Sequence, residues 1–173
     1  AKQARFTRPR WIAAWALVLG AMVLMLAGCP RENVARDART YVTTIHPLKM
    51  MLQELTRGRA EVVAIIPPGA SPHTFEPRPS DLRAVGRASC FFTVSPLLDG
   101  WAEKLPAKER VEVVGLLPTG ARKFFPEGVE DDHHSEGEGA VVDPHFWTDP
   151  ETVAELLPVL TEKLCAIDPG GAS

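Results

Sequence analysis

The chain has 173 residues and a mass of 18.9 kDa, with 45% hydrophobic and 24% charged residues. This composition excludes an intrinsically disordered chain, and the length suits one domain, or one and part of a second. Residues 1–28 carry four of the 19 Lys and Arg residues and none of the 22 Asp and Glu residues, so the remainder has a formal charge of −7 (15 positive against 22 negative). An acidic body of this kind argues against a nucleic-acid surface, which needs clustered basic residues.

The N-terminal segment has the pattern of a secretory signal. Four basic residues precede an apolar run from Trp11 to Leu26, which at 16 residues is short of the ~20 that a membrane-spanning helix needs. The run ends in Leu26-Ala27-Gly28-Cys29, which resembles the lipobox of bacterial lipoproteins, in which the cysteine is lipidated. We therefore expect a lipoprotein signal peptide over residues 1–28, lipidation at Cys29 and a polar tether over 29–39. The alternative is an uncleaved membrane anchor, and both place the body outside the cytoplasm.

The body alternates strand-like and helix-like segments. Runs of β-branched or apolar residues predict strands at 41–45, 61–66, 90–94 and 111–114. Helical spacing predicts helices at 47–58, 80–87, 96–105 and 150–167, the third helix segment being amphipathic and the last kinked at Pro158. Ser80 is the expected N-cap of the second helix, and Asp149 of the last. The sequence thus predicts an α/β fold, a parallel four-stranded sheet with flanking helices, with ligands beyond the carboxyl ends of the strands.

Residues 115–143 form a predicted loop rich in Gly, Pro and acidic side chains, without any useful period. Two cysteines remain in the body, Cys90 and Cys165, and the sequence leaves open whether they pair. Cys90 begins an apolar strand, where a small buried thiol is expected. No C-x-x-C occurs, so a cysteine zinc site is not indicated.

Two histidines lie on loops that prolines stiffen. His73 follows the second predicted strand in the stretch PPGASPH, and His145 lies in DPHFWTDP, directly before the last helix. Two rigidly held imidazoles are half of the ligand set of a tetrahedral zinc ion, and Asp143 or Asp149 is placed to fix a tautomer by hydrogen bonding. The alternative, from these residues alone, is a pair of ordinary loop histidines.

Three stretches in this order give the sequence a wider resemblance. The sequence resembles the zinc/manganese substrate-binding proteins of ABC importers in three stretches downstream of a lipobox. They are residues 65–81 (IIPPGASPHTFEPRPSD), 94–101 (VSPLLDGW) and 143–150 (DPHFWTDP). The resemblance implies a bilobed α/β protein that holds a metal ion between its lobes. It implies that His73 and His145 are metal ligands.

The same resemblance divides the chain into an N-terminal α/β metal-binding lobe at 40–149 and a connector helix at 150–173. In the family, a second lobe supplies the remaining ligands. Because this chain stops at Ser173, we expect that the C-terminal lobe is absent and the protein truncated, with no further ligand unless Glu76 or another loop residue takes that role. His46 does not match a ligand position, and we expect it to serve only the start of a helix.

An acidic and His-containing stretch lies where zinc-specific members of that family carry a metal-capturing loop. It offers auxiliary metal ligands at Asp131, Asp132, His133, His134 and Glu136. The alternative is a solvated charged loop.

The function that these observations predict is a lipid-anchored solute-binding protein, in the periplasm or on the cell surface, that captures Zn²⁺ and delivers it to an ABC transporter permease. Histidine ligation favours zinc, and Mn²⁺ is the alternative cargo. A low-affinity periplasmic zinc buffer is a further alternative. An enzyme is not expected, because a metallohydrolase needs a third protein ligand and a general base, and no H-E-x-x-H occurs.

Overall fold

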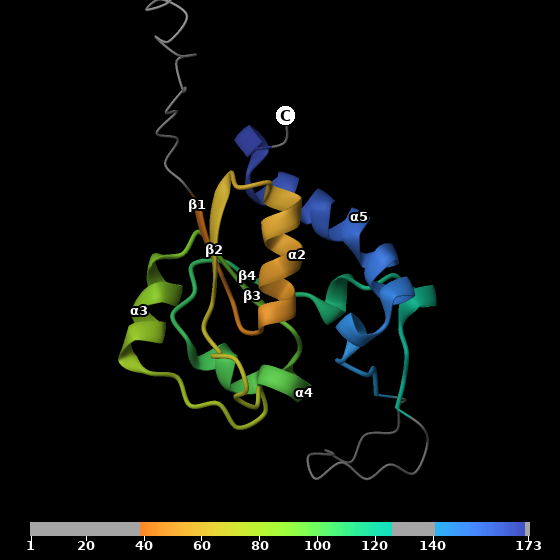
Figure 1. Ribbon diagram of the computed structural model, residues 1–173, viewed down its shortest axis with the longest axis horizontal. Helices are drawn as coiled ribbons and strands as arrows, with labels where there is room; N and C mark the ends of the chain where they lie inside the picture. The colour runs from red at the N-terminus through yellow and green to blue at the C-terminus, as the bar shows by residue number, and fades with distance from the viewer. Residues whose placement is uncertain (1–38, 126–140, 172–173) are drawn as a thin grey trace, which may run out of the picture. The chain divides into compact units, whose positions relative to one another are not determined.

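Four parallel strands form one sheet in the computed structural model, which describes residues 39–125 and 141–171. They are β1 (Arg39–Thr43), β2 (Ala60–Ala64), β3 (Cys90–Thr93) and β4 (Arg110–Glu112), in the spatial order β2-β1-β3-β4 (Figure 1). In this register Tyr41 of β1 lies opposite both Val62 and Cys90. The predicted parallel four-stranded α/β sheet is confirmed.

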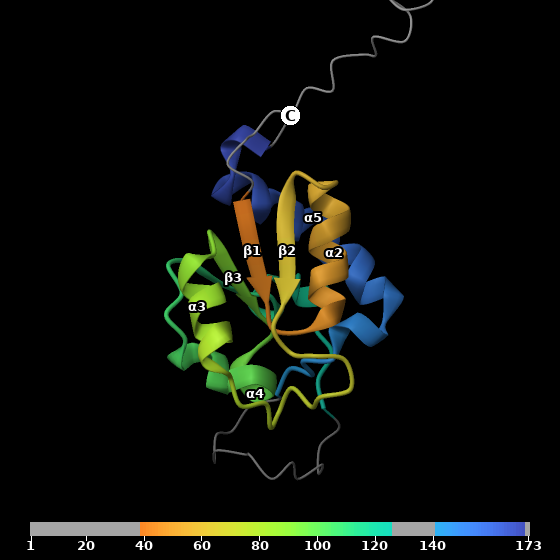
Figure 2. The same cartoon turned by 60° about the vertical axis from the view of Figure 1, so that its left-hand side comes forward.

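Helices cover both faces of the sheet. They are α2 (His46–Thr56), α3 (Pro79–Arg87), the single-turn α4 (Pro96–Asp99) and α5 (Pro150–Ile167). Figures 1 and 2 show α2 and α5 on one face and α3 on the other. Within the described ranges, none of the helices is long and apolar enough to cross a membrane.

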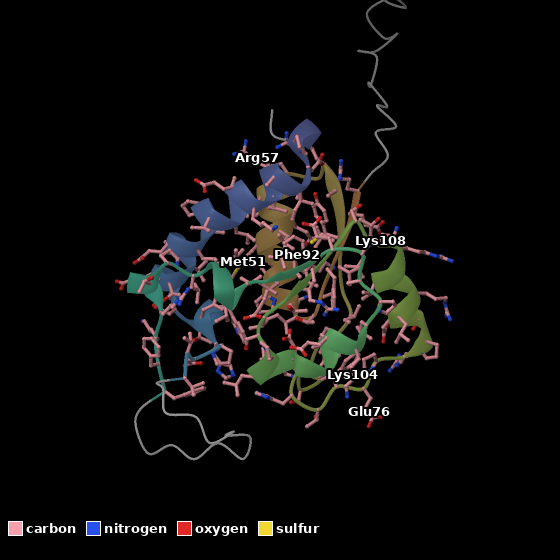
Figure 3. The ribbon with its side chains drawn as sticks, turned by 180° about the vertical axis from the view of Figure 1, so that it is seen from behind. Met51, Arg57, Glu76, Phe92, Lys104 and Lys108 are labelled. Atoms are coloured by element: carbon pink, nitrogen blue, oxygen red, sulfur yellow. The ribbon has the colours of Figure 1, made fainter. Side chains whose placement is uncertain are left out.

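The core lies between the helices and the sheet. All four residues of β3 are buried, as expected for a strand covered on both faces. Figure 3 shows Phe92 of this strand in the interior, with the labelled charged side chains at the periphery. Leu48 and Leu52 of α2 and Leu156 and Leu160 of α5 are fully buried, so each of these helices contributes an apolar stripe to the core.

Several predicted boundaries differ from the structure by one or two residues, and two of the differences have clear local reasons. The first strand was predicted to continue to residue 45, but Ile45 is the extended N-cap of α2, whose first turn contains Pro47. Ser80 is not the N-cap of α3. The helix starts at Pro79, and the cap position is Arg78, whose backbone N–H donates to Asp81 Oδ2 at 2.8 Å. The carboxylate of Asp81, in the first turn, thus accepts a hydrogen bond from the backbone N–H at the start of the helix.

The predicted helix over 96–105 is two shorter pieces. α4 ends at Asp99, and a 3₁₀ segment, η1 (Gly100–Lys104), follows it. The side chain of Asp99 turns back to accept hydrogen bonds from Val94 N (2.8 Å) and Ser95 N (3.0 Å). Further 3₁₀ turns are η2 (Val114–Leu116), η3 (Thr119–Ala121), η4 (Phe146–Thr148) and η5 (Pro169–Gly171). The described part of the predicted 115–143 loop therefore contains 3₁₀ turns, although its sequence shows no regular hydrophobic period.

The last helix starts where the sequence indicated. Asp149 is its N-cap and accepts hydrogen bonds from the backbone N–H groups of Glu151 and Thr152, with Pro150 in the first turn. α5 continues through Pro158 and ends at Ile167. The predicted signal peptide, Cys29, and the acidic-loop residues Asp131, Asp132, His133, His134 and Glu136 lie outside the described residues.

Candidate metal centre

The loop that carries His73 begins with a tight turn. The backbone N–H of Ala70 donates to Pro67 O at 3.2 Å, with Pro68 second in the turn and Gly69 third at φ +84°. This is the arrangement of a type II turn, whose third position needs a positive φ and therefore favours glycine. The turn redirects the chain after β2, and His73 follows it with an exposed side chain.

Trp101 of η1 holds the same loop from the other side. Its indole Nε1 donates to Pro72 O at 2.7 Å, and its ring packs against Phe75 at a centroid distance of 5.1 Å. Pro72 and Phe75 flank His73 in sequence. Trp101 and His73 also border one open cavity of about 530 Å³, together with residues of α4.

His145 is held by a carboxylate two residues before it. Asp143 Oδ1 accepts from the backbone N–H of His145 (2.9 Å) and lies 2.7 Å from its Nδ1. Because a carboxylate can only accept, Nδ1 carries the proton of this hydrogen bond, and in the neutral imidazole the lone pair for a metal is then on Nε2. Asp143 is fixed in turn by its backbone N–H, which donates to Lys123 O at 2.8 Å.

The structure brings the two histidines together from positions 72 residues apart in the chain. The ring centroids of His73 and His145 are 6.1 Å apart, with 46° between the ring planes. Two imidazoles on one tetrahedral zinc ion would have centroids about 5 Å apart, since Zn–N bonds are about 2.0–2.1 Å long. The observed separation is about 1 Å longer than this. The role of both as ligands stays a prediction, which this geometry permits.

Other candidate residues lie elsewhere or have other partners. Asp149, the second candidate for fixing a tautomer, caps α5 and forms an ion pair with Lys123. That ion pair, together with Thr152, lowers the pKa of Asp149 to about 2. Glu76 is exposed and lies at the outer edge of the molecule (Figure 3). His46 is the exposed first residue of α2, as expected.

The histidine pair does not complete a metal site within the described ranges. Over 39–125 and 141–171, no group of three or more His, Cys, Asp or Glu side chains is arranged to hold a metal ion. Two imidazoles leave at least two coordination positions of a tetrahedral ion unfilled.

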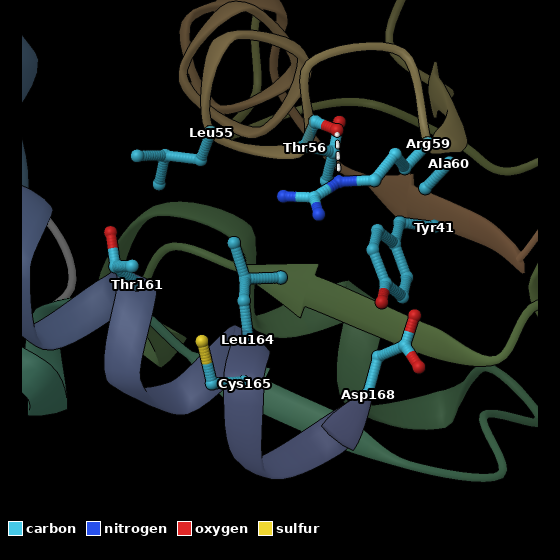
Figure 4. Close-up of a pocket in the computed structure, with 9 residues that line it drawn as sticks. All are labelled: Tyr41, Leu55, Thr56, Arg59, Ala60, Thr161, Leu164, Cys165 and Asp168. Atoms are coloured by element: carbon cyan, nitrogen blue, oxygen red, sulfur yellow. Dashed lines mark hydrogen bonds between the residues drawn. The ribbon is translucent and has the colours of Figure 1, made fainter. Parts of the chain in front are cut away.

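A second cavity of about 160 Å³ lies between the C-terminal ends of α2 and α5 (Figure 4). Tyr41, Leu164, Cys165 and Asp168 are among the residues that line it. Its walls contain no histidine and mix apolar and charged groups. Cys165 is partly exposed there, whereas Cys90 is buried in β3, and both are free thiols. Burial raises the pKa of the Cys90 thiol to about 12, so the expectation of a small buried thiol is confirmed.

Two contributors to the centre were missed by sequence reasoning. Trp101 lay in a motif that carried the family resemblance, but nothing local indicated its bond to Pro72, 29 residues away. Asp99 is only 1% exposed and accepts from Thr44 Oγ1 at 2.6 Å, from Val94 N and from Ser95 N. An acidic residue within a predicted amphipathic helix gives no signal of burial.

With the fold and the paired histidines described, comparison with known proteins identifies the family. The family model described as zinc-uptake complex component A, periplasmic (ZnuA), matches residues 42–173. The chain belongs to this family. The family resemblance inferred from the sequence is thereby confirmed. The members of this family are metal-binding transport components and not enzymes.

Individual relatives bind two different metals. The manganese-binding lipoprotein MntA of Halalkalibacterium halodurans is 29% identical over 163 residues, which cover 91% of this chain and 51% of that protein. The zinc-binding lipoprotein AdcA of Streptococcus pneumoniae is 26% identical over 155 residues, covering 87% and 31%.

Among solved structures, a Zn(II)-bound variant of AdcAII from Streptococcus pneumoniae matches with a TM-score of 0.62 and 28% identity, over 78% of this chain and 49% of that one. The chain thus spans about half the length, or less, of these relatives.

Proposed function

We propose that this chain is the metal-capturing component of an ABC-type importer, with His73 and His145 as ligands to one metal ion. The observation that carries the proposal is the approach of the two imidazoles to 6.1 Å, with Nδ1 of His145 held by Asp143. A histidine fixed in this way presents Nε2 to a metal with little orientational freedom left to lose. Family membership supports a role in transport.

Zinc is the proposed cargo. Imidazole nitrogen is a ligand that suits Zn²⁺, whereas Mn²⁺ prefers carboxylate, carbonyl and water oxygens. Mn²⁺ remains the second candidate because a relative at 29% identity is a manganese-binding lipoprotein. Residues outside the described ranges are proposed to complete the coordination shell, since the two histidines fill only half of it.

Lipid anchoring at Cys29 and a location outside the cytoplasm belong to the same proposal. They are supported by the Leu-Ala-Gly-Cys motif and by relatives whose names describe them as lipoproteins. The acidic stretch at 131–138 is proposed to capture metal weakly and to pass it to the histidine pair. The partner that receives the ion is proposed to be an ABC transporter permease.

A competitive titration tests the metal site. Zn²⁺ and, separately, Mn²⁺ are titrated into the purified chain and into its His73→Ala, His145→Ala and His46→Ala variants. The last is a matched control, because His46 is exposed on α2. The proposal predicts that each of the first two substitutions weakens Zn²⁺ binding by about 10-fold or more and that the control changes it less than about twofold.

Two outcomes contradict this proposal in different ways. Zn²⁺ binding that survives both substitutions, and is lost when His133 and His134 are replaced, favours a weak metal buffer. Tighter binding of Mn²⁺ than of Zn²⁺, still dependent on His73 and His145, keeps the site and changes the cargo.

A further inference from the structure

Within the described residues, the loop around His73 makes one hydrogen bond to the rest of the molecule beyond its own turn, and its Phe75 side chain also packs against the core. Within the described part of the chain, residues 71–77 make a single hydrogen bond, from Trp101 Nε1 to Pro72 O at 2.7 Å. The Phe75 ring packs on the same indole. His73 lies between these two contacts and is itself exposed, so its place depends on its neighbours.

Trp101 lies on a segment that is hydrogen-bonded to the sheet. Two residues earlier, the buried carboxylate of Asp99, the last residue of α4, accepts from Thr44 Oγ1, Val94 N and Ser95 N at the carboxyl ends of β1 and β3. From β4, Arg110 Nη1 donates to Ala102 O at 2.6 Å, directly after Trp101. The segment that carries the indole is therefore hydrogen-bonded to the ends of β1 and β3 and to β4, whereas the described residues 71–77 make their one hydrogen bond to the indole.

We propose that Trp101 is a positioning residue for His73: its indole N–H holds the Pro72 carbonyl so that the His73 imidazole stays beside His145 before the metal arrives. This inference rests on the proposed function, in which His73 is a ligand. A loop held in its bound conformation loses less conformational entropy on binding, so the tether increases affinity without touching the ion.

The test separates positioning from ordinary stabilisation. Trp101→Phe keeps an aromatic ring against Phe75 and removes the N–H donor. Benzothienylalanine at position 101 keeps the shape of the indole and replaces the N–H by sulfur, so it serves where the Phe variant fails to fold. The matched control is Thr161→Val, which also removes a 2.7 Å side-chain donor to a backbone carbonyl, that of Leu157, on α5.

For each variant of the full chain we would measure Zn²⁺ affinity, the free energy of unfolding without metal, and the NMR signals of the histidine rings. Loss of the tether is expected to raise Kd about fivefold, which corresponds to one hydrogen bond of ~1 kcal/mol. The His73 ring signal should broaden while that of His145 keeps its line width. The Thr161→Val control should leave Kd and both ring signals unchanged.

Two results would overturn the inference, and they are distinguishable. If His73→Ala weakens binding and the loss of the indole N–H changes only the free energy of unfolding, Trp101 is merely structural and the proposed metal site stands. If His73→Ala leaves Zn²⁺ affinity unchanged, the proposed ligand role fails, and the positioning role fails with it.

Discussion

The buried carboxylate of Asp99 is predicted to be among the most costly polar side chains to remove from this fold. It is 1% exposed and accepts three hydrogen bonds, from Thr44 Oγ1 at 2.6 Å, Val94 N at 2.8 Å and Ser95 N at 3.0 Å. These donors come from the ends of two neighbouring strands. Asp99→Ala would therefore leave three buried donors without their acceptor.

The size of the effect follows from those three bonds. An unsatisfied buried donor costs about 1–3 kcal/mol, so the loss is roughly 3–9 kcal/mol before any compensation. Part of it is offset, because burial of the carboxylate is itself unfavourable: burial raises the pKa of Asp99, against the lowering effect of its hydrogen bonds. A net loss of about 3 kcal/mol is expected, a large part of the ~5–15 kcal/mol stability of a typical domain.

Urea unfolding of the metal-free chain, followed by circular dichroism, measures this loss. The matched control is Asp81→Ala, which removes a carboxylate that accepts one exposed backbone hydrogen bond, at the start of α3, and should cost about 0.5–1 kcal/mol. The Asp99 variant should shift the midpoint several times further, with an unchanged m value. Equal shifts for the two variants would refute the conclusion that the Asp99 carboxylate joins β1 to β3.

Three further predictions concern charge and reactivity. Asp143→Asn removes the carboxylate that sets the tautomer of the His145 imidazole. Zn²⁺ affinity should fall at least about 10-fold, measured by the same titration, and an unchanged affinity would show that the tautomer is set otherwise. The pKa of Asp149 is lowered to about 2 from 3.8, mainly by Lys123. The folded state thus binds this proton more weakly than the unfolded state, and stability falls as the pH decreases from about 4 to 2. Lys123→Met should reduce this fall in urea midpoints recorded from pH 5 to 2, and an identical profile would contradict the assignment. Cys165 is partly exposed, whereas the buried Cys90 has a pKa of about 12. Cys165→Ser should therefore abolish rapid reaction of the body's thiols with a disulfide reagent, and fast labelling of the remaining buried thiol would show that its strand opens readily.

Much of the fold could be predicted from local patterns. The strands are short β-branched or apolar runs, and each element between them shows helical spacing or a cap, as at Asp149. The errors arose where two local signals overlapped. Ile45 has strand chemistry but is the extended residue at a helix start, and the helix from Pro96 ends early because the Asp99 side chain bonds back to the β3 end.

The two candidate histidines could be picked out from the sequence, but the contacts that hold their loops could not. His73 and His145 stood out because prolines stiffen their loops, and parallel strands bring such loops to one edge of the sheet. The sequence offered Asp143 and Asp149 equally as tautomer-setting groups, and the structure shows that Asp143 has this contact. The Trp101 bond to Pro72 joins segments whose approach depends on packing of α4 and η1, which no local pattern specifies.

The central claim is that one metal ion binds both histidines. A crystal structure of the zinc-soaked protein, with anomalous differences recorded at the zinc absorption edge, tests it most directly. We predict one strong peak about 2.0–2.1 Å from Nε2 of His145 and from a ring nitrogen of His73. Without metal, the centroids of these two rings are 6.1 Å apart. A strong zinc peak elsewhere, with no density between these two imidazoles, would contradict the claim.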